Sequence, residues 1–242
     1  MASLYLASDL EGRDVVAGET VTVTGDEARH AITVARVRVG ERVAVSDGAG
    51  LLVAGTVTAV EPGAVSVAAE SVRRHPPAEP EVWLAQALAK GDRDELAVQA
   101  ATELGVSGVI PWAAERSISR WDGAKAVKGR ERWGSIVREA TKQSIRPRVP
   151  VVDPVASTAS LTRLPGLVLV LKPTAETRLV DVPLDADRVT LVVGPEGGVT
   201  PRELAAFAEA GAVAVRLGPE VLRTSTAGPA ALAVLNARLG RW

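Results

Sequence analysis

Three prolines within five residues divide this chain into two parts with different patterns. Pro76, Pro77 and Pro80 lie in the stretch RRHPPAEPE at residues 73–81. Proline lacks a backbone N–H and fixes its φ angle, so neither a helix nor a central strand can run through such a stretch. We therefore predict a first domain at residues 1–73, a linker at 74–81 and a second domain at 82–242.

The first part is patterned as short strands separated by turn signals. Strands are expected at residues 21–24, 42–48, 51–60 and 64–72. The last two alternate apolar and polar residues around Glu61-Pro62-Gly63, which predicts a hairpin. A short helix is expected over 26–37. This pattern favours a small β-barrel.

The second part alternates strands with helices. Strands are expected at residues 82–88, 108–112, 166–171, 189–193 and 212–217, and helices at 93–104, 127–145, 201–210 and 226–239. Such alternation is typical of an α/β domain with a mostly parallel sheet.

Composition excludes several kinds of site. The chain has no cysteine and only two histidines, His30 and His75, so we expect no thiolate chemistry and no metal centre. The first residues lack the basic and apolar regions of a signal peptide, and no apolar run is long enough for a membrane span. A cytoplasmic location without a membrane partner is therefore the expectation.

Charge is unevenly distributed along the chain. Residues 116–148 contain ten basic and three acidic side chains, so this stretch carries +7 while the whole chain carries −1. Such asymmetry favours a localised contact with a polyanion, and a solvated helix face is the alternative.

A glycine-rich loop follows the expected strand at 189–193. Gly194-Pro195-Glu196-Gly197-Gly198 precedes Thr200, Pro201 and Glu203, which have the spacing of a capping box with proline at the first helical position. Ligands bind at the carboxyl ends of strands in open α/β sheets. The spacing matches no phosphate-binding motif. Because Glu196 would repel phosphate, the loop favours a neutral or cationic ligand; a tight turn without a ligand is the alternative.

A second loop of similar composition follows the expected strand at 212–217. It contains Gly218-Pro219 and then Arg223, Thr224, Ser225 and Thr226 before the last helix. Either Ser225 or Thr226 is expected to cap that helix. Two such loops at neighbouring strand ends predict one shared pocket.

Four stretches carry a resemblance to a known family: GPEGG, LGPEVLRTSTA (217–227), KGDRDELAVQAATELGV (90–106) and RWGSIVREATKQSIRPRVP (132–150). Together they resemble the small-subunit (16S) ribosomal RNA uridine-N3 methyltransferase family of the SPOUT superfamily. The similarity covers nearly the whole chain. It implies a C-terminal trefoil-knotted α/β methyltransferase domain preceded by a PUA-like β-barrel that binds RNA.

The resemblance also implies a cofactor, partners and site residues. The cofactor is S-adenosyl-L-methionine. The partner is 16S ribosomal RNA within an assembled small subunit, and two copies of the chain pair through the knotted domain. The implied cofactor-binding residues are Leu171, Lys172, Pro173, Gly194, Pro195, Glu196, Gly197, Gly198, Leu217, Gly218, Val221, Leu222, Thr224 and Thr226.

Arg223 is the candidate catalytic residue. Its guanidinium could stabilise negative charge on the uridine oxygens, and a loop-ordering salt bridge is the alternative role. No side chain stands out as the general base, and His30 is expected to be structural unless it contacts RNA. The candidate RNA-binding residues are Arg29, His30, Arg36, Arg38, Lys90, Arg93, Arg116, Arg120, Arg146 and Arg148.

The chain departs from the family pattern at three places: Ser225 stands where glutamate is frequent, and residues 142–146 and 34–36 also differ. Three other functions therefore stay open. They are a SPOUT enzyme acting on a ribose 2′-oxygen or on transfer RNA, a non-catalytic RNA-binding assembly factor, and a nucleotide-binding enzyme.

Overall fold

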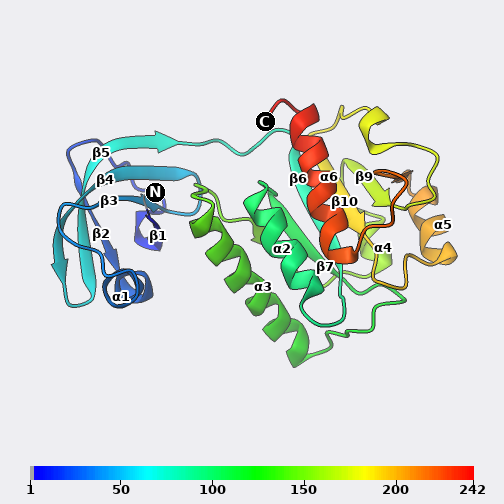
Figure 1. The fold of residues 1–242 in the computed structure, drawn as a ribbon, viewed down its shortest axis with the longest axis horizontal. Coiled ribbons are helices and arrows are strands. Elements are labelled where there is room, and N and C mark those ends of the chain that lie inside the picture. The colour runs from blue at the N-terminus through cyan, green and yellow to red at the C-terminus, as the bar shows by residue number, and fades with distance from the viewer. Residues whose placement is uncertain (1–2) are drawn as a thin grey trace. The chain divides into compact units, whose positions relative to one another are not determined.

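The computed structural model describes residues 3–242, and the chain forms two compact units (Figure 1). The first unit runs to Pro77 and also includes Thr141–Val149. The second comprises Ala78–Ala140 and Pro150–Trp242. Among the described residues, no helix combines the length and the apolar character that crossing a membrane would need.

The first unit is built on one five-stranded sheet. Its elements are β1 (Ser3–Leu6), a 3-10 turn (Ser8–Leu10), β2 (Thr20–Thr24), α1 (Gly25–Thr33), β3 (Arg42–Ser46), β4 (Leu51–Glu61) and β5 (Ala64–Arg74). The strand order is β1-β3-β4-β5-β2. Only the β1–β3 pair is parallel among the pairs of this sheet that the structure describes. Helix α1 packs against β1, β2 and β5, and so contacts both edge strands.

The long β4–β5 hairpin bends at irregularities in its pairing. The register shifts between Ala54 and Gly55 and again between Val57 and Ala59, and such bulges increase the local twist. At Gly55 a side chain would collide with the Ala68 carbonyl oxygen, so the close approach of the two strands requires glycine there. Apolar residues of all five strands and of α1 meet in one core on the inner side of this bent sheet.

A segment from the middle of the chain completes the first unit. The backbone N–H of Gly50 donates to the Pro147 carbonyl, and that of Val149 donates to Gly48. Ala49 and Arg148 form an antiparallel bridge. Residues 141–149 thus add main-chain hydrogen bonds that residues 1–73 alone do not supply.

The second unit contains a six-stranded parallel sheet with the order β11-β9-β10-β6-β7-β8. Its strands are β6 (Glu81–Ala87), β7 (Gly108–Trp112), β8 (Val151–Val152), β9 (Leu167–Leu171), β10 (Arg188–Val193) and β11 (Val213–Val215). Its helices are α2 (Arg93–Glu103), α3 (Ala124–Gln143, whose last three residues belong to the first unit), α4 (Thr158–Leu161), α5 (Pro201–Glu209) and α6 (Thr224–Arg238), with a 3-10 turn at Leu179–Asp181.

Helices cover both faces of this sheet. Helices α2 and α6 lie side by side over β6 and β10 (Figure 1). On the other face, Leu161 of α4 and Phe207 of α5 join a core with Trp83, Trp112 and further strand residues. The Phe207 ring meets the Trp112 ring edge-on, with 5.7 Å between the centroids. Because both faces are buried, the strands are mostly apolar.

The segment after β11 runs alongside the loop that follows β9. The Lys172 N–H donates to the Val215 carbonyl, and the Leu179 N–H donates to Arg216. The Arg216 guanidinium also donates to the Ala175 carbonyl at 2.6 Å. Residues 172–179 and 213–216 are therefore held together although a strand and a helix separate them in the chain.

Every strand and helix expected from the sequence is present. The main shortening is in α1, which ends at Thr33 rather than at residue 37, because the chain turns through Arg36 with φ +53°. Strands β1 and β8 and the short α4 were not predicted. Each has four residues or fewer, too short for a periodic pattern to develop.

Candidate functional site

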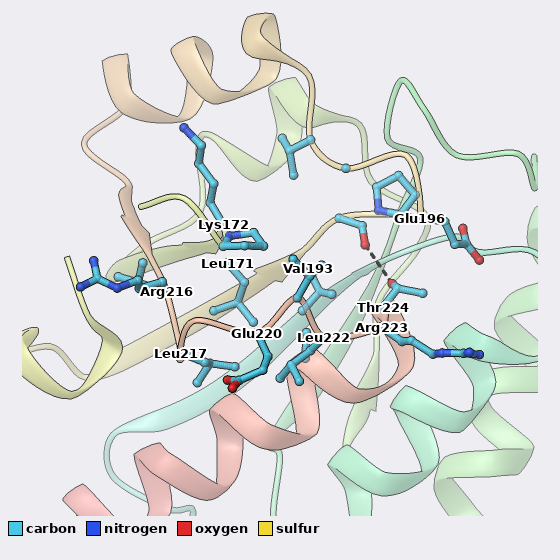
Figure 2. A pocket seen from close by; sticks show the side chains of 18 of the residues that line it. Leu171, Lys172, Val193, Glu196, Arg216, Leu217, Glu220, Leu222, Arg223 and Thr224 are labelled. Atoms are coloured by element: carbon cyan, nitrogen blue, oxygen red, sulfur yellow. Dashed lines mark hydrogen bonds between the residues drawn. The ribbon is translucent and has the colours of Figure 1, made fainter. Parts of the chain in front are cut away.

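A cavity of about 500 Å³ opens at the carboxyl ends of β9, β10 and β11 (Figure 2). Three loops line it: residues 171–173 after β9, 193–199 after β10, and 215–224 between β11 and α6. Parallel strands place their carboxyl ends at one edge of the sheet, which is why loops far apart in sequence converge there.

The first glycine loop is anchored through its acidic residue. Glu196 Oε1 accepts a hydrogen bond from Arg93 Nη1 at 2.8 Å and from the Lys90 backbone N–H at 3.3 Å. Burial alone would raise the pKa of Glu196, but the hydrogen bond from Arg93 and the backbone N–H donors outweigh it and lower the pKa below its ordinary value. Glu196 is thus an ionised anchor for this loop.

A second arginine holds the same loop from its outer side. Arg116 Nη1 donates to the Gly197 carbonyl oxygen at 2.8 Å. A side chain at residue 197 would lie 3.2 Å from Arg116 Cβ, so glycine allows this close approach. Gly197 therefore faces Arg116, and it does not line the cavity.

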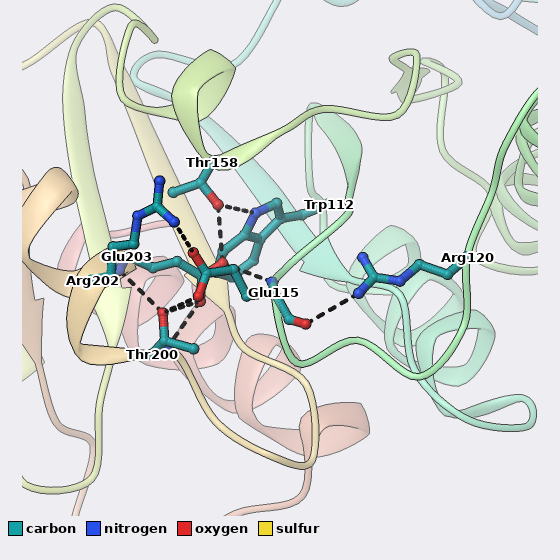
Figure 3. A network of polar contacts seen from close by, with 7 residues as sticks. All are labelled: Trp112, Glu115, Arg120, Thr158, Thr200, Arg202 and Glu203. Carbon is teal, nitrogen blue, oxygen red and sulfur yellow. Dashed lines mark hydrogen bonds and ion pairs between the residues drawn. The ribbon is translucent and has the colours of Figure 1, made fainter.

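A polar network fixes the start of α5 below this loop (Figure 3). Thr200 and Glu203 form the capping box that the sequence predicted. Glu203 is 1% exposed, and its carboxylate accepts from the Thr200 N–H and the Glu115 N–H, both at 2.9 Å, and from the Thr158 hydroxyl at 3.0 Å. Thr158 in turn accepts from the Trp112 indole N–H. One buried carboxylate thereby links three loops at this edge of the sheet.

Helix α6 begins earlier than the sequence predicted. Its N-cap is Arg223 and its first residue is Thr224, so the expectation that Ser225 or Thr226 caps the helix is wrong. The Thr224 hydroxyl donates to the Gly194 carbonyl and accepts from the buried Gln86 amide, each at 2.8 Å. The Thr224 hydroxyl thus joins the two loops, and the cap lies at least two residues before the expected position.

Arg223 lies at the rim of the cavity and is exposed. Its guanidinium makes no hydrogen bond or ion pair with any residue of the described chain, 3–242. Figure 2 shows it extending away from Leu217 and Leu222. Among the described residues, Arg223 therefore has no acidic partner with which it could form the loop-ordering salt bridge that was its alternative role.

The residues implied for the cofactor gather at this cavity. Except for Gly197 and Thr226, all of them contribute to its lining, and so do Arg223 and Arg93. Lining residues that the sequence did not indicate are Val193, Val199, Leu204, Val215, Arg216, Glu220 and Ala227. Glu220 and Ala227 lie within the motif at 217–227, and all the others except Leu204 lie within two residues of one of the two motifs.

The candidate RNA-binding residues of the first unit fall into two groups. Arg29, His30, Arg36 and Arg38 are exposed on α1 and on the loop that follows it. The exposure of His30 contradicts the expectation of a structural histidine. Arg146 and Arg148 are much less accessible.

Arg146 and Arg148 differ in their surroundings within the first unit. Burial lowers the pKa of Arg146 to about 10. Arg148 donates through Nε and Nη2 to the His75 carbonyl oxygen. Arg148 thus joins two segments of the first unit, and contact of either side chain with RNA stays a prediction.

Several basic residues of the second unit also have protein partners. Arg93 and Arg116 hold the glycine loop, and Arg120 donates to the carbonyl oxygens of Ala114 and Glu115. Farther along the basic stretch, Arg132 contacts both carboxylate oxygens of Glu95. The local charge of this stretch is thus partly compensated within the fold. Lys90 is exposed, and its ammonium group makes no hydrogen bond or ion pair with the described residues.

The cavity can accept a zwitterionic organic ligand. Its wall is mainly apolar, through residues such as Leu171, Val193 and Leu217, while acidic and basic groups lie at its rim. This combination is typical of small-molecule sites. Nowhere in residues 3–242 do three or more potential metal-ligating side chains cluster.

Comparison with known proteins matches two parts of the chain to two families. Residues 76–236 match the RNA methyltransferase domain family, and residues 23–70 match the RNA methyltransferase PUA domain family. The ribosomal RNA small subunit methyltransferase E of Mycobacterium tuberculosis is 45% identical over 235 residues, which cover 93% of this chain and 89% of that protein. The chain belongs to the ribosomal RNA small subunit methyltransferase E family.

Other members of the methyltransferase E family support this assignment. The Bacillus subtilis protein is 30% identical over 240 residues and 94% of each chain. The crystal structure of the Neisseria gonorrhoeae protein bound to S-adenosyl methionine superposes with a TM-score of 0.86 and 30% identity over 98% of each chain. The predicted α/β methyltransferase domain with a parallel sheet, preceded by a PUA-like domain, is confirmed.

Proposed function

We propose that this chain is an S-adenosylmethionine-dependent methyltransferase that methylates N3 of a uridine in 16S ribosomal RNA. Family membership supports the reaction class and the ribosomal RNA substrate. The single observation that carries the proposal is the cavity formed by the glycine loop and the loop before α6. Its position at the carboxyl edge of a parallel sheet is where such folds bind small ligands.

The cavity suits this cofactor in size and charge. A volume of about 500 Å³ lies within the range of small-molecule sites. Its apolar wall suits an adenine ring, and its rim offers carboxylates for a cationic group and guanidinium or ammonium groups for a carboxylate. S-Adenosylmethionine supplies the methyl group on a sulfonium centre that already contains its own leaving group.

The protein then has to position the base and stabilise charge. N3 of uridine carries a proton, and negative charge develops on O2 and O4 as that proton leaves. The guanidinium of Arg223 is at the rim and unpaired in the described chain, so it is available to stabilise these oxygens. Because N3 lies on the Watson–Crick edge, the uridine has to be unpaired and turned into the site.

Exposed cations supply the RNA contacts in this proposal. Arg29, Arg36 and Arg38 of the first unit and Lys90 of the second are accessible. Contacts of this kind bind phosphates and orient the RNA, while base contacts select the target. Binding should therefore weaken steeply as salt is added.

We also propose that the active form is a homodimer that acts on assembled small subunits in the cytoplasm. Val221 and Leu222, which line the cavity, are 78% and 37% exposed, and this exposed apolar surface favours cover by a second copy of the chain. Light scattering after size exclusion tests the dimer. Comparing free 16S RNA with intact small subunits as substrates tests the second part.

Mass spectrometry of 16S RNA from cells with and without the gene tests the reaction itself. We expect one N3-methyluridine to disappear in the deletion strain and to return with the wild-type gene. Reverse transcription gives a second readout, because an N3-methyl group blocks pairing. Loss of a ribose 2′-O-methyl group or of a transfer RNA methyl group would contradict the proposal. So would an absence of S-adenosylmethionine binding in calorimetry, which would favour a non-catalytic assembly factor.

A further inference from the structure

A buried chain of hydrogen bonds lies beneath the cavity and joins three separate elements. Gln86 near the end of β6 is fully buried, and its Nε2 donates to Thr224 Oγ1 at 2.8 Å. The Thr224 hydroxyl, at the start of α6, donates to the Gly194 carbonyl oxygen at 2.8 Å (Figure 2). Gly194 is the first residue of the glycine loop after β10.

The direction of these bonds is fixed by chemistry. A carbonyl oxygen can only accept, so the single hydrogen of the Thr224 hydroxyl goes to Gly194. The hydroxyl oxygen then accepts from the Gln86 amide nitrogen, which can only donate. The same nitrogen also lies 3.3 Å from the Ala87 carbonyl oxygen, which favours this orientation of the amide.

A glutamine at this buried position lowers the stability of the fold. Its Oε1 is buried and has no hydrogen-bond partner in the described part of the chain. An unsatisfied buried acceptor lowers stability, and an apolar side chain of similar size would avoid that cost. The amide is therefore explained by the bond that it donates and not by stability of the sheet.

Gly194 and Thr224 both line the cavity, whereas Gln86 does not. At Gly194 a side chain would lie 2.8 Å from Val199 Cγ2, so the loop backbone passes very close to its own next turn. The Thr224 hydroxyl fixes that backbone against the first turn of α6, and with it the N-cap residue Arg223.

We propose that Gln86 is a positioning residue of the methyl-transfer site. By donating to the Thr224 hydroxyl, it directs the hydroxyl hydrogen to Gly194 and so fixes the glycine loop relative to the start of α6. The inference rests on the proposed use of this cavity by S-adenosylmethionine. It assigns a role to a residue that touches neither cofactor nor RNA.

Substitutions at Thr224 test the central bond. Thr224→Val keeps the shape and removes the hydroxyl, and we expect the Kd for S-adenosylhomocysteine, measured by calorimetry, to rise about tenfold, the effect of one lost buried hydrogen bond. Thr224→Ser restores the hydroxyl and should return the Kd to near the wild-type value. The matched control is Thr190→Val, a buried threonine of β10 whose hydroxyl has no partner within residues 3–242. This control should bind as the wild type does.

Substitutions at Gln86 test the directing role. Gln86→Met removes the donor without offering a new acceptor, and we expect a rise in Kd of about threefold because the hydroxyl is no longer directed. Gln86→Glu has a sharper signature. A protonated carboxyl group can donate as the amide does, whereas a carboxylate accepts the Thr224 hydrogen and withdraws it from Gly194.

The Gln86→Glu protein should therefore bind S-adenosylhomocysteine almost normally at low pH and progressively less well as pH rises. Burial raises the pKa of a carboxyl group, which moves this change toward neutral pH. Gln86→Met and the wild type should lack it. A role in stability alone would change the melting temperature without this pH dependence.

The outcomes separate this inference from the function on which it rests. If wild-type protein binds S-adenosylhomocysteine but the Thr224→Val protein binds equally well and the Gln86→Glu protein shows no distinct pH profile, the positioning role is overturned. If wild-type protein shows no binding at all, both proposals are overturned. If it binds but leaves 16S RNA unmethylated, only the proposed RNA reaction is refuted.

Discussion

Two loops of the second unit begin with the same three residues, Gly-Pro-Glu, and are held in opposite ways. In the loop after β10, Pro195 is buried and Glu196 pairs with Arg93. In the loop after β11, Pro219 is exposed, and Glu220 has no polar partner among residues 3–242. Both loops line the same cavity.

The difference shows that tertiary contacts, not the local sequence, decide how firmly such a loop is held. The first loop has an ion pair at Glu196, a hydrogen bond from Arg116 and a capped helix directly after it. The second reaches α6 through exposed residues, ending at the unpaired Arg223. We interpret the first loop as a rigid wall of the cofactor site, and the second as the side at which RNA approaches.

The largest expected difference between the loops concerns stability. Glu203→Ala removes the carboxylate that accepts bonds below the first loop, and buried donors lose their partner. We expect the free energy of unfolding to fall by about 3 kcal/mol in urea titrations. Glu220→Ala in the second loop is the control and should change it by less than about 0.5 kcal/mol. Equal losses would remove the distinction between the loops.

The rate of methylation should fall when Arg223 of the second loop is replaced. Arg223→Ala is expected to lower the rate of 16S RNA methylation about a hundredfold, as when one charge-stabilising donor is lost. The Kd for S-adenosylhomocysteine should stay close to the wild-type value, because the guanidinium extends away from Leu217 and Leu222 in the cavity wall. Arg223→Lys should recover part of the rate. An unchanged rate in the alanine variant would exclude a catalytic role.

A smaller, pH-dependent effect on the free energy of unfolding should distinguish Glu196 of the first loop from Glu220 of the second. Because the pKa of Glu196 is lowered in the folded protein, its contact with Arg93 stabilises the fold fully above the unfolded value of about 4.3. The contribution is lost as pH falls through the lowered pKa. We expect Glu196→Gln to cost about 0.5 kcal/mol at pH 7 and progressively less as pH falls below about 4.

Chemical denaturation of both proteins at several pH values measures this difference. Glu220→Gln, which removes the corresponding acid from the second loop, is the control and should show no such trend. A constant difference between wild type and Glu196→Gln across this pH range would mean that the ion pair does not stabilise the fold.

Much of the fold could be predicted because local patterns persist in the structure. Apolar runs became the buried strands of the parallel sheet, and Thr200 with Glu203 formed the expected capping box. The start of α6 was misplaced by at least two residues. Its first residue, Thr224, bonds through its hydroxyl to Gly194, 30 residues away in the chain, a contact that no local pattern indicates.

The site was predictable in its position and less so in the roles of its charges. Arg93 and Arg116 were expected to contact RNA, yet each is bonded to the glycine loop, with partners 103 and 81 residues away. Gln86 gave no signal at all, because a single glutamine in a strand belongs to no motif. Such partnerships depend on strand order, which sequence spacing does not specify.

Because residues 141–149 belong to the first unit, this unit cannot be completed until they have been translated. When Pro77 leaves the ribosome, Thr141–Val149 has yet to be translated, so the nascent first unit still lacks the partners of Gly48 and Gly50. Those groups stay open until residues 78–140 have also been made. Cutting the chain at its proline-rich junction would therefore release a first unit without residues 141–149. The first unit is thus not a module that can be separated from the rest of the chain at this junction.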